Sequence, residues 1–82
     1  MSTTSETITN EQIETLYARA GMAGDIAMAA ICKRALDLLD LPLSRGWTSA
    51  LTSREQARVT SMSVLQARLE CAATISAAEA MG

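Results

Sequence analysis

The stretch GMAGDIAMAAICKRALDLLDLP, residues 21–42, contains the turn and the helix around which the rest of the chain is predicted to fold. Gly21 can adopt a positive φ without strain and is expected to end a preceding helix, while Asp25 can cap the next one. We predict that this next helix spans Ile26–Leu41 and that Pro42 ends it, because the residue before a proline is pushed out of the α region. The first two turns of the helix carry no charge, which is typical of a central helix with apolar neighbours on most sides.

The helix before this turn has a complete start signal in ITNEQI, which begins at Ile8. Thr9 and Gln12 form the T-x-x-Q pattern of a capping box, and Ile8 and Ile13 occupy the positions of a hydrophobic staple. Leu16 is one of the apolar residues that then recur at helical spacing towards Gly21, and Arg19 is one of the polar residues turned to solvent. The link to the following helix is too short to do more than reverse the chain, so the two helices should form an antiparallel hairpin.

The C-terminal half is predicted to be a connector followed by a long helix. Residues 43–51, LSRGWTSAL, hold the only Trp and are expected to form the connector. Thr52 and Glu55 form a second capping box, which favours a helix from Ser53 to Ala80. Residues 60–63, TSMS, have weak helix propensity and could instead divide this helix into two, giving a four-helix bundle.

Two apolar stripes run along this C-terminal segment on roughly opposite sides. The first comprises Met62, Leu65, Leu69, Ala72 and Ala73, and the second comprises Val64, Cys71, Ile75 and Ala78. One stripe can pack against the hairpin, and we assign the second to self-association in a homodimer or to a partner protein, because exposed apolar strips usually mark interfaces. Alternatively, the hairpin covers both stripes.

The composition indicates an all-α domain. Of the 82 residues, 49% are hydrophobic but only 2% are aromatic, and a core of Ala, Leu, Ile and Met suits closely packed helices better than a sheet. We predict a disordered tail at residues 1–8 and a single small helical bundle at residues 9–82. No apolar run reaches the ~18 residues of a membrane span and the start of the chain does not resemble a signal peptide, so we expect a cytoplasmic protein without membrane contact.

Few residues of this chain are suited to catalysis or metal binding. The absence of His excludes Ser-His-Asp and Cys-His catalysis and the commonest zinc ligand sets. Cys32 and Cys71 are expected to be small core residues with free thiols, and a disulfide between them would require their helices to be neighbours. Asp37 and Asp40 are expected to lie on a solvated face. We therefore predict no enzymatic activity, no cofactor, no metal and no small-molecule substrate.

A local basic cluster suggests an alternative function. Arg45, Arg54 and Arg58 lie close in sequence around Trp47, and Arg beside an aromatic ring can contact phosphate and stack on a base. Because the net charge is −2, this patch alone would have to attract nucleic acid. The alternative is therefore a small dimeric nucleic-acid-binding regulator. A helix-turn-helix is not favoured, because the would-be recognition helix begins with Ile26 and alanines where base-reading side chains should project.

Part of the chain resembles a helical segment that recurs in short, uncharacterised bacterial and phage proteins. That segment reads approximately T-x-E-Q-I, A-G-D, C-x-R-A-L, A-R-x-E-C-A and A-x-A-M. The matching residues are Thr9, Glu11, Gln12, Ile13, Ala23, Gly24, Asp25, Cys32, Arg34, Ala35, Leu36, Ala67, Arg68, Glu70, Cys71, Ala72, Ala78, Ala80 and Met81. The resemblance departs at residues 37–66. It implies a mobile-element origin and a role in binding a host protein, such as inhibition of a defence complex of the CRISPR-Cas type.

Overall fold

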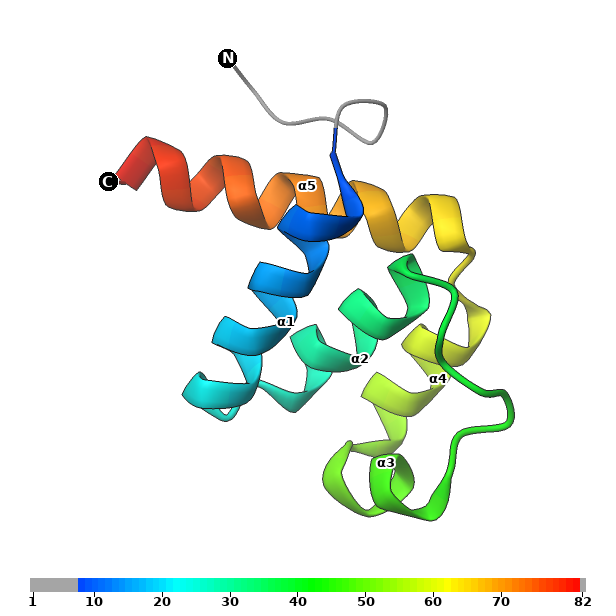
Figure 1. Ribbon diagram of the computed structural model, residues 1–82. Coiled ribbons are helices and arrows are strands. Elements are labelled where there is room, and N and C mark those ends of the chain that lie inside the picture. The colour runs from blue at the N-terminus through cyan, green and yellow to red at the C-terminus, as the bar shows by residue number, and fades with distance from the viewer. Residues whose placement is uncertain (1–7, 82) are drawn as a thin grey trace.

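The computed structural model describes residues 8–81, which form five helices and no strand (Figure 1). The helices are α1 (Asn10–Ala23), α2 (Ile26–Ala35), α3 (Arg45–Ala50), α4 (Ser53–Ser61) and α5 (Val64–Met81). The predicted all-α bundle, with its N-terminal hairpin and a broken C-terminal helical segment, is confirmed. Residues 1–7 of the predicted tail lie outside the described residues, whereas Ile8 is buried. Within residues 8–81, no helix combines the length and the hydrophobicity needed to cross a membrane.

The start of α1 follows its local sequence signals. The Gln12 amide donates to the Thr9 hydroxyl (3.1 Å), and the Thr9 amide donates to the Gln12 side chain (2.9 Å), so the predicted capping box is confirmed. Ile8 and Ile13 are both buried in the core, as a hydrophobic staple requires. This start therefore joins a local cap to the tertiary packing of the molecule.

The end of α1 differs from the prediction. The helix continues past Gly21, and Gly24 is the residue that adopts a positive φ, 76°. The Gly24 amide donates to the Gly21 carbonyl and the Asp25 amide donates to the Ala20 carbonyl, which is the pattern of a Schellman motif. A turn at this position also lets the Asp25 side chain cap α2, where it accepts from the Met28 amide (3.2 Å). The predicted cap by Asp25 is confirmed, and the predicted helix end at Gly21 is wrong.

α2 ends at Ala35, well before the predicted end at Leu41. Asp37 takes the left-handed conformation with φ 59°, and its amide and that of the next residue donate to carbonyls in the last turn of α2. A second Schellman motif therefore ends the helix, with Asp in place of the usual Gly. Leu39 can then return to the core, where it is buried. Pro42 follows in the non-helical segment and does not end the helix.

The predicted connector contains the short helix α3, which the sequence analysis did not predict. Trp47 of α3 is half-buried and packs against the core cluster. The second predicted capping box is confirmed, because the Glu55 amide donates to the Thr52 hydroxyl (3.2 Å) and the Thr52 amide donates to the Glu55 side chain (2.9 Å). α4 begins at Ser53, as predicted.

A break separates α4 from α5, so the alternative of a divided helix is confirmed. Met62 is buried with extended backbone, and the Ser63 hydroxyl accepts from the Gln66 amide (3.0 Å) at the start of α5. Arg34 of α2 donates from Nε to the Met62 carbonyl (2.8 Å), which holds the corner against the central helix. With α3 included, the described residues form five helices, one more than the four of the divided-helix alternative.

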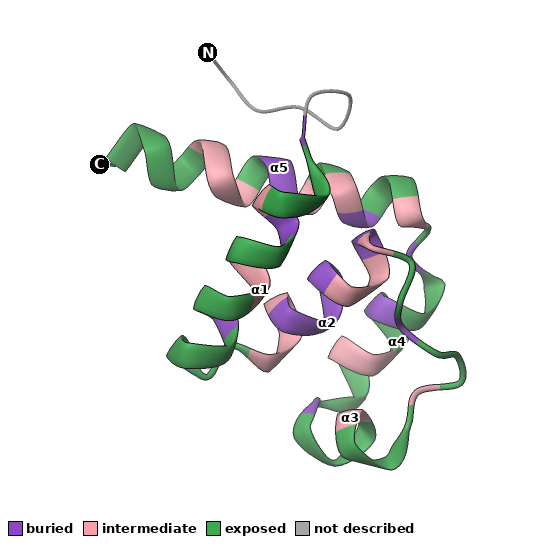
Figure 2. Ribbon diagram, in the orientation of Figure 1, coloured by how far each residue is buried: buried purple, intermediate pink, exposed green. Residues whose placement is uncertain are grey.

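α2 is the central helix, in contact with α1, α4 and α5, and buried residues lie along most of its length (Figures 1 and 2). Fully buried residues of α2 and α5 include Ala30, Cys32, Ala67 and Cys71, which are all small. Small side chains at the contact allow two helices to pack closely. α5 runs across the hairpin, and its C-terminal end extends beyond it as an exposed helix (Figure 2).

Candidate functional site

An open groove of about 740 Å³ lies between α1 and the C-terminal half of α5. Its lining residues are Thr9, Glu11, Gln12, Thr15, Leu16 and Arg19 on the α1 side and Thr74, Ile75, Ala78 and Glu79 on the α5 side. On each helix these residues recur at intervals of about four, so each helix presents one face to the groove. The groove therefore lies between one face of α1 and one face of α5. Both faces are uncovered where α5 extends past the hairpin.

The floor of the groove is apolar. Leu16 and Ile75 are half-buried and pack against the core cluster, and Ala78 adds a small exposed apolar surface. The hydroxyls of Thr15 and Thr74 each donate to a carbonyl one turn earlier in their own helix (3.0 and 2.9 Å). Because these hydroxyls already have hydrogen-bond partners, an apolar side chain bound in the groove would not leave them buried and unsatisfied.

The rim of the groove is charged. Glu11 and Arg19 line the α1 side and Glu79 lines the α5 side. None of these three side chains forms an ion pair with a described residue. The ion pair found within residues 8–81 joins Arg58 to Glu70. Unpaired charges of both signs around an apolar floor can select a partner of complementary charge.

Arg68 sets the position of the two groove walls. Its guanidinium donates to the Ile8 carbonyl (2.8 Å) and to the Asn10 side chain (3.1 Å), and so ties the N-terminal half of α5 to the start of α1. This tie lies just before the groove residues of α5, which begin at Thr74. These hydrogen bonds hold the start of α1 against α5.

The residues assigned to the second stripe are divided by the structure. Val64 and Ile75 are half-buried, Cys71 is fully buried beside Cys32, and Ala78 is exposed. Cys71 therefore belongs to the core and is removed from the predicted surface stripe. Of the stripe, Ile75 and Ala78 line the groove.

The first stripe also differs from its expected role. Leu65 and Leu69 are 61% and 42% exposed, while Ala72 is buried. The break at Met62 starts α5 as a separate helix, so the rotation of α5 is set by its own packing. The face with small residues packs on α2, because two large leucines would hold the helices further apart.

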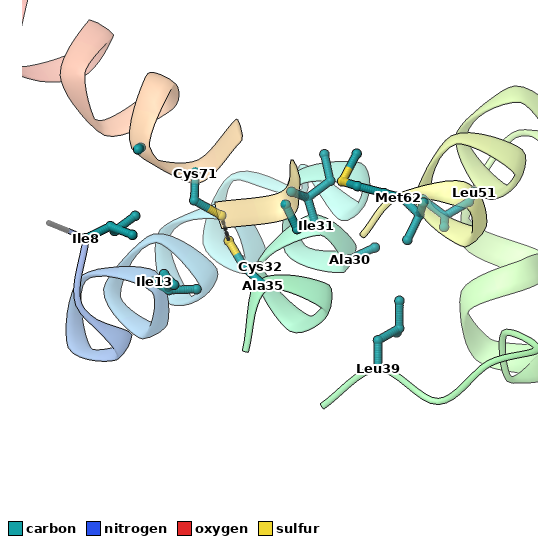
Figure 3. Packing of buried hydrophobic residues seen from close by; sticks show 13 residues of the cluster. Ile8, Ile13, Ala30, Ile31, Cys32, Ala35, Leu39, Leu51, Met62 and Cys71 are labelled. Carbon is teal, nitrogen blue, oxygen red and sulfur yellow. Dashed lines mark hydrogen bonds between the residues drawn. The ribbon is translucent and has the colours of Figure 1, made fainter. Parts of the chain in front are cut away.

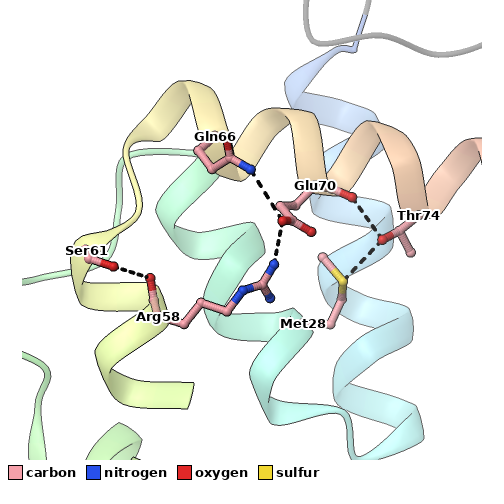
Figure 4. A network of polar contacts seen from close by, with 6 residues as sticks. All are labelled: Met28, Arg58, Ser61, Gln66, Glu70 and Thr74. Carbon is pink, nitrogen blue, oxygen red and sulfur yellow. Dashed lines mark hydrogen bonds and ion pairs between the residues drawn. The ribbon is translucent and has the colours of Figure 1, made fainter. Parts of the chain in front are cut away.

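The predicted basic patch is also divided. Arg58 of α4 forms an ion pair with Glu70 of α5, which also accepts from Gln66, so this cation faces a carboxylate (Figure 4). Arg45 and Arg54 are exposed on α3 and α4, and Trp47 is half-buried against the core. Arg58 is therefore less available to a phosphate than its sequence position suggested, and the indole of Trp47 is only partly open to stacking.

Cys32 and Cys71 lie close together, but the described part of the chain contains no group of three or more His, Cys, Asp or Glu side chains that could hold a metal ion. The hydrogen bond with Cys71, together with burial, raises the pKa of the Cys32 thiol well above its usual value, whereas the hydrogen bond with Cys32 lowers the pKa of Cys71. Two buried thiols without further ligands do not match the four-coordinate sites that zinc prefers.

Sequence reasoning did not identify the α1 wall of the groove. Leu16 was attributed to the apolar face of the hairpin and Arg19 to solvent, and both assignments are compatible with a groove edge. The signal that could have located the groove is the mismatch in length between the long α5 and the shorter helices beneath it.

Searches of family models, curated proteins and solved structures gave no match to the chain.

Proposed function

We propose that this chain acts by protein–protein interaction and that the groove between α1 and α5 is its self-association surface. The observation that supports this proposal is the uncovered apolar floor of Leu16, Ile75 and Ala78. Apolar surface with a charged rim is typical of an interaction site. No catalytic step is part of the proposal.

A second copy of the chain is the occupant that fits best. The exposed end of α5, residues 77–81, presents alanines and Met81, which are small or flexible apolar side chains suited to an apolar groove. In a two-fold dimer each α5 end would lie across the groove of the other protomer, so every contact would occur twice. Such a dimer would bring Glu79 of one protomer near Arg19 of the other, which gives the two rims complementary charge.

The interface would be modest in size. Stable interfaces bury about 800 Å² of accessible surface on each partner. The groove and the exposed end of α5 together make up only part of the 5283 Å² accessible surface of the protomer. We therefore expect a dissociation constant on the order of micromolar, so that protein concentration decides the oligomeric state.

Charge reversal across the groove tests this proposal. Arg19→Glu and Glu79→Arg should each place like charges opposite one another in the dimer and weaken association about tenfold or more. The double variant carries opposite charges again and should recover most of the lost affinity. Light scattering or sedimentation over a wide concentration range measures the dissociation constant of each protein.

Arg54→Glu is the matched control. It makes the same charge change at an exposed position of α4 outside the groove, and we expect the wild-type dissociation constant. The proposal fails if the wild-type chain stays monomeric throughout the concentration range. It also fails if the single variants associate as tightly as the wild type, or if the double variant does not recover.

The wider biological setting is a proposal that rests on the sequence resemblance. We propose a cytoplasmic protein of phage or mobile-element origin whose partner is a host protein, with inhibition of a defence complex as the specific case. The nucleic-acid alternative depends on Arg45, Arg54 and Arg58, and it is weakened by the ion pair of Arg58 with Glu70. It predicts duplex DNA binding with a steep salt dependence, which replacement of the three arginines with Ala would remove.

A further inference from the structure

The two cysteines meet in the core although 38 residues separate them in the chain. Cys32 lies on α2 and Cys71 lies on α5, and their sulfur atoms are 3.9 Å apart (Figure 3). Both residues are 0% exposed, and the structure holds them as free thiols. These two side chains lie at the contact between α2 and α5, and they can form a covalent bond with each other. α5 also forms one wall of the groove.

We propose that Cys32 and Cys71 form an oxidisable dithiol that a hydroperoxide converts into a disulfide joining α2 to α5. A disulfide has a sulfur–sulfur bond of about 2.05 Å, so the two atoms, now 3.9 Å apart, must approach by roughly 1.9 Å. Rotation of the two side chains and a small shift of α5 can supply this movement. The inference is independent of self-association, because it concerns the core of one protomer.

The surroundings favour closure of the bond. Alanines flank both thiols in the core cluster, with Ala35 one turn after Cys32 and Ala67 one turn before Cys71, so no large side chain is fixed at these positions. Within the described residues no third metal ligand is grouped with the cysteines. Bond formation between the thiols is therefore better matched to this pair than metal binding.

The chemistry balances with the hydroperoxide as the only oxidant. Cys71, whose pKa is lowered by the hydrogen bond with Cys32, supplies the thiolate that attacks one peroxide oxygen. The oxygen–oxygen bond breaks, the leaving oxygen takes a proton, and Cys71 becomes a sulfenic acid. The sulfur of Cys32 then attacks the sulfur of Cys71, the sulfur–oxygen bond breaks, and water leaves with the proton of Cys32. Two thiols are oxidised to a disulfide, and the hydroperoxide is reduced to water and, for an alkyl hydroperoxide, an alcohol.

The reaction should be slow and its effect on stability large. Both thiols are fully buried, so the hydroperoxide must reach them during transient openings of the α2–α5 contact. Once formed, the bond closes a long loop in the unfolded chain and thereby destabilises the unfolded state. We expect the midpoint of thermal unfolding to rise by about 10 °C or more.

The test uses the full-length wild-type chain treated with hydrogen peroxide. The protein is then unfolded, alkylated with iodoacetamide and analysed by intact mass, and thermal unfolding is followed before and after the treatment. We expect loss of both thiol hydrogens, no alkylation, a monomer-sized product under denaturing conditions and a raised unfolding midpoint. Reduction with dithiothreitol should restore the original midpoint.

Cys32→Ala and Cys71→Ala are the matched controls, since each removes one partner and leaves the other thiol. Neither variant should gain stability on oxidation. The proposal is overturned if both wild-type cysteines remain open to alkylation after a peroxide treatment as long as the time in which iodoacetamide alkylates both thiols of the untreated folded protein. It is equally overturned if the product is a disulfide between two chains, a sulfinic or sulfonic acid, or a disulfide with a lowered unfolding midpoint.

Discussion

Gly21 and Gly24 lie one turn apart at the end of α1 but have different backbone roles. Gly24 has φ 76°, a conformation that a residue with a Cβ adopts only at a cost. Gly21 is an ordinary helical residue, and a Cβ added there would meet nothing within 4 Å. The sequence pattern predicted the helix end at Gly21, whereas the structure places it at Gly24.

This difference predicts opposite effects of one substitution. Gly21→Ala should raise the free energy of unfolding by about 0.5 kcal/mol, because Ala has the higher helix propensity. Gly24→Ala should lower it by about 1 kcal/mol, because Ala is strained in the left-handed region. Urea unfolding of both variants measures the difference. Equal effects of the two substitutions would contradict the assignment of the turn.

At the scale of the elements, guanidinium groups connect helix ends that are distant in sequence. Arg34 of α2 donates to the Met62 carbonyl at the corner between α4 and α5, and Arg68 of α5 donates to the Ile8 carbonyl before α1. Both bonds reach backbone groups that lie outside the regular hydrogen bonding of a helix. Helix termini leave such groups without intrahelical partners, so a long side chain from a neighbour can satisfy them.

Arg34→Met tests this role of the side chain. Met keeps an apolar stem of similar length but has no donor, so the Met62 carbonyl would lose its partner at a buried corner. We expect the free energy of unfolding to fall by about 1–2 kcal/mol. Arg54→Met removes an exposed guanidinium on α4 and should change stability by less than about 0.5 kcal/mol. A similar loss in both variants would show that charge, and not the bond to the corner, is responsible.

The elements also show where prediction from sequence reaches its limit. The caps at Thr9, Asp25 and Thr52 were predicted because each depends on four consecutive residues. The end of α2 was not, because the left-handed residue is an Asp at position 37, where the sequence shows no Gly. Helix ends of this kind are decided by whether the following chain can return to the core, and that is tertiary information.

The candidate groove could be predicted only in part. Ile75 and Ala78 were selected from the apolar pattern, and they do line the groove. Cys71 was selected by the same pattern but faces α2, because the break at Met62 frees α5 to turn its small residues toward the central helix. Leu16 was out of reach, since its neighbours across the groove come from a helix more than fifty residues away in the chain.

At the scale of the whole molecule, the core is small and rich in alanine and cysteine. The deepest positions include Ala30, Ala67 and the two cysteines, which bury little apolar area each. A domain of this size has little stability to spare, and oligomerisation is a common supplement. The exposed end of α5 contributes little to the stability of the protomer, because a helix end that does not pack on the rest of the molecule is only marginally stable in water.

If the dimer forms through the groove, folding and association are therefore linked. Binding of a second copy to the folded state alone stabilises that state by mass action, so thermal stability should increase with protein concentration. Above the dissociation constant we expect the unfolding midpoint to rise by about 3–5 °C for each tenfold increase in concentration. Below it, the midpoint should become constant.

Ile75→Glu separates this linkage from the stability of the protomer itself. A carboxylate on the floor of the groove would be buried without a partner in the dimer but can reach water in the monomer, because Ile75 is only half-buried there. The variant should show an unfolding midpoint that does not depend on concentration. This midpoint should lie below the limit that the wild type approaches on dilution, because Ile75 also packs against the core cluster of the protomer. Leu65→Glu, on an exposed part of α5 outside the groove, should keep the wild-type dependence. Should Leu65→Glu abolish the dependence while Ile75→Glu retains it, the self-association surface would be the leucine face of α5, and the groove would be free for a different partner.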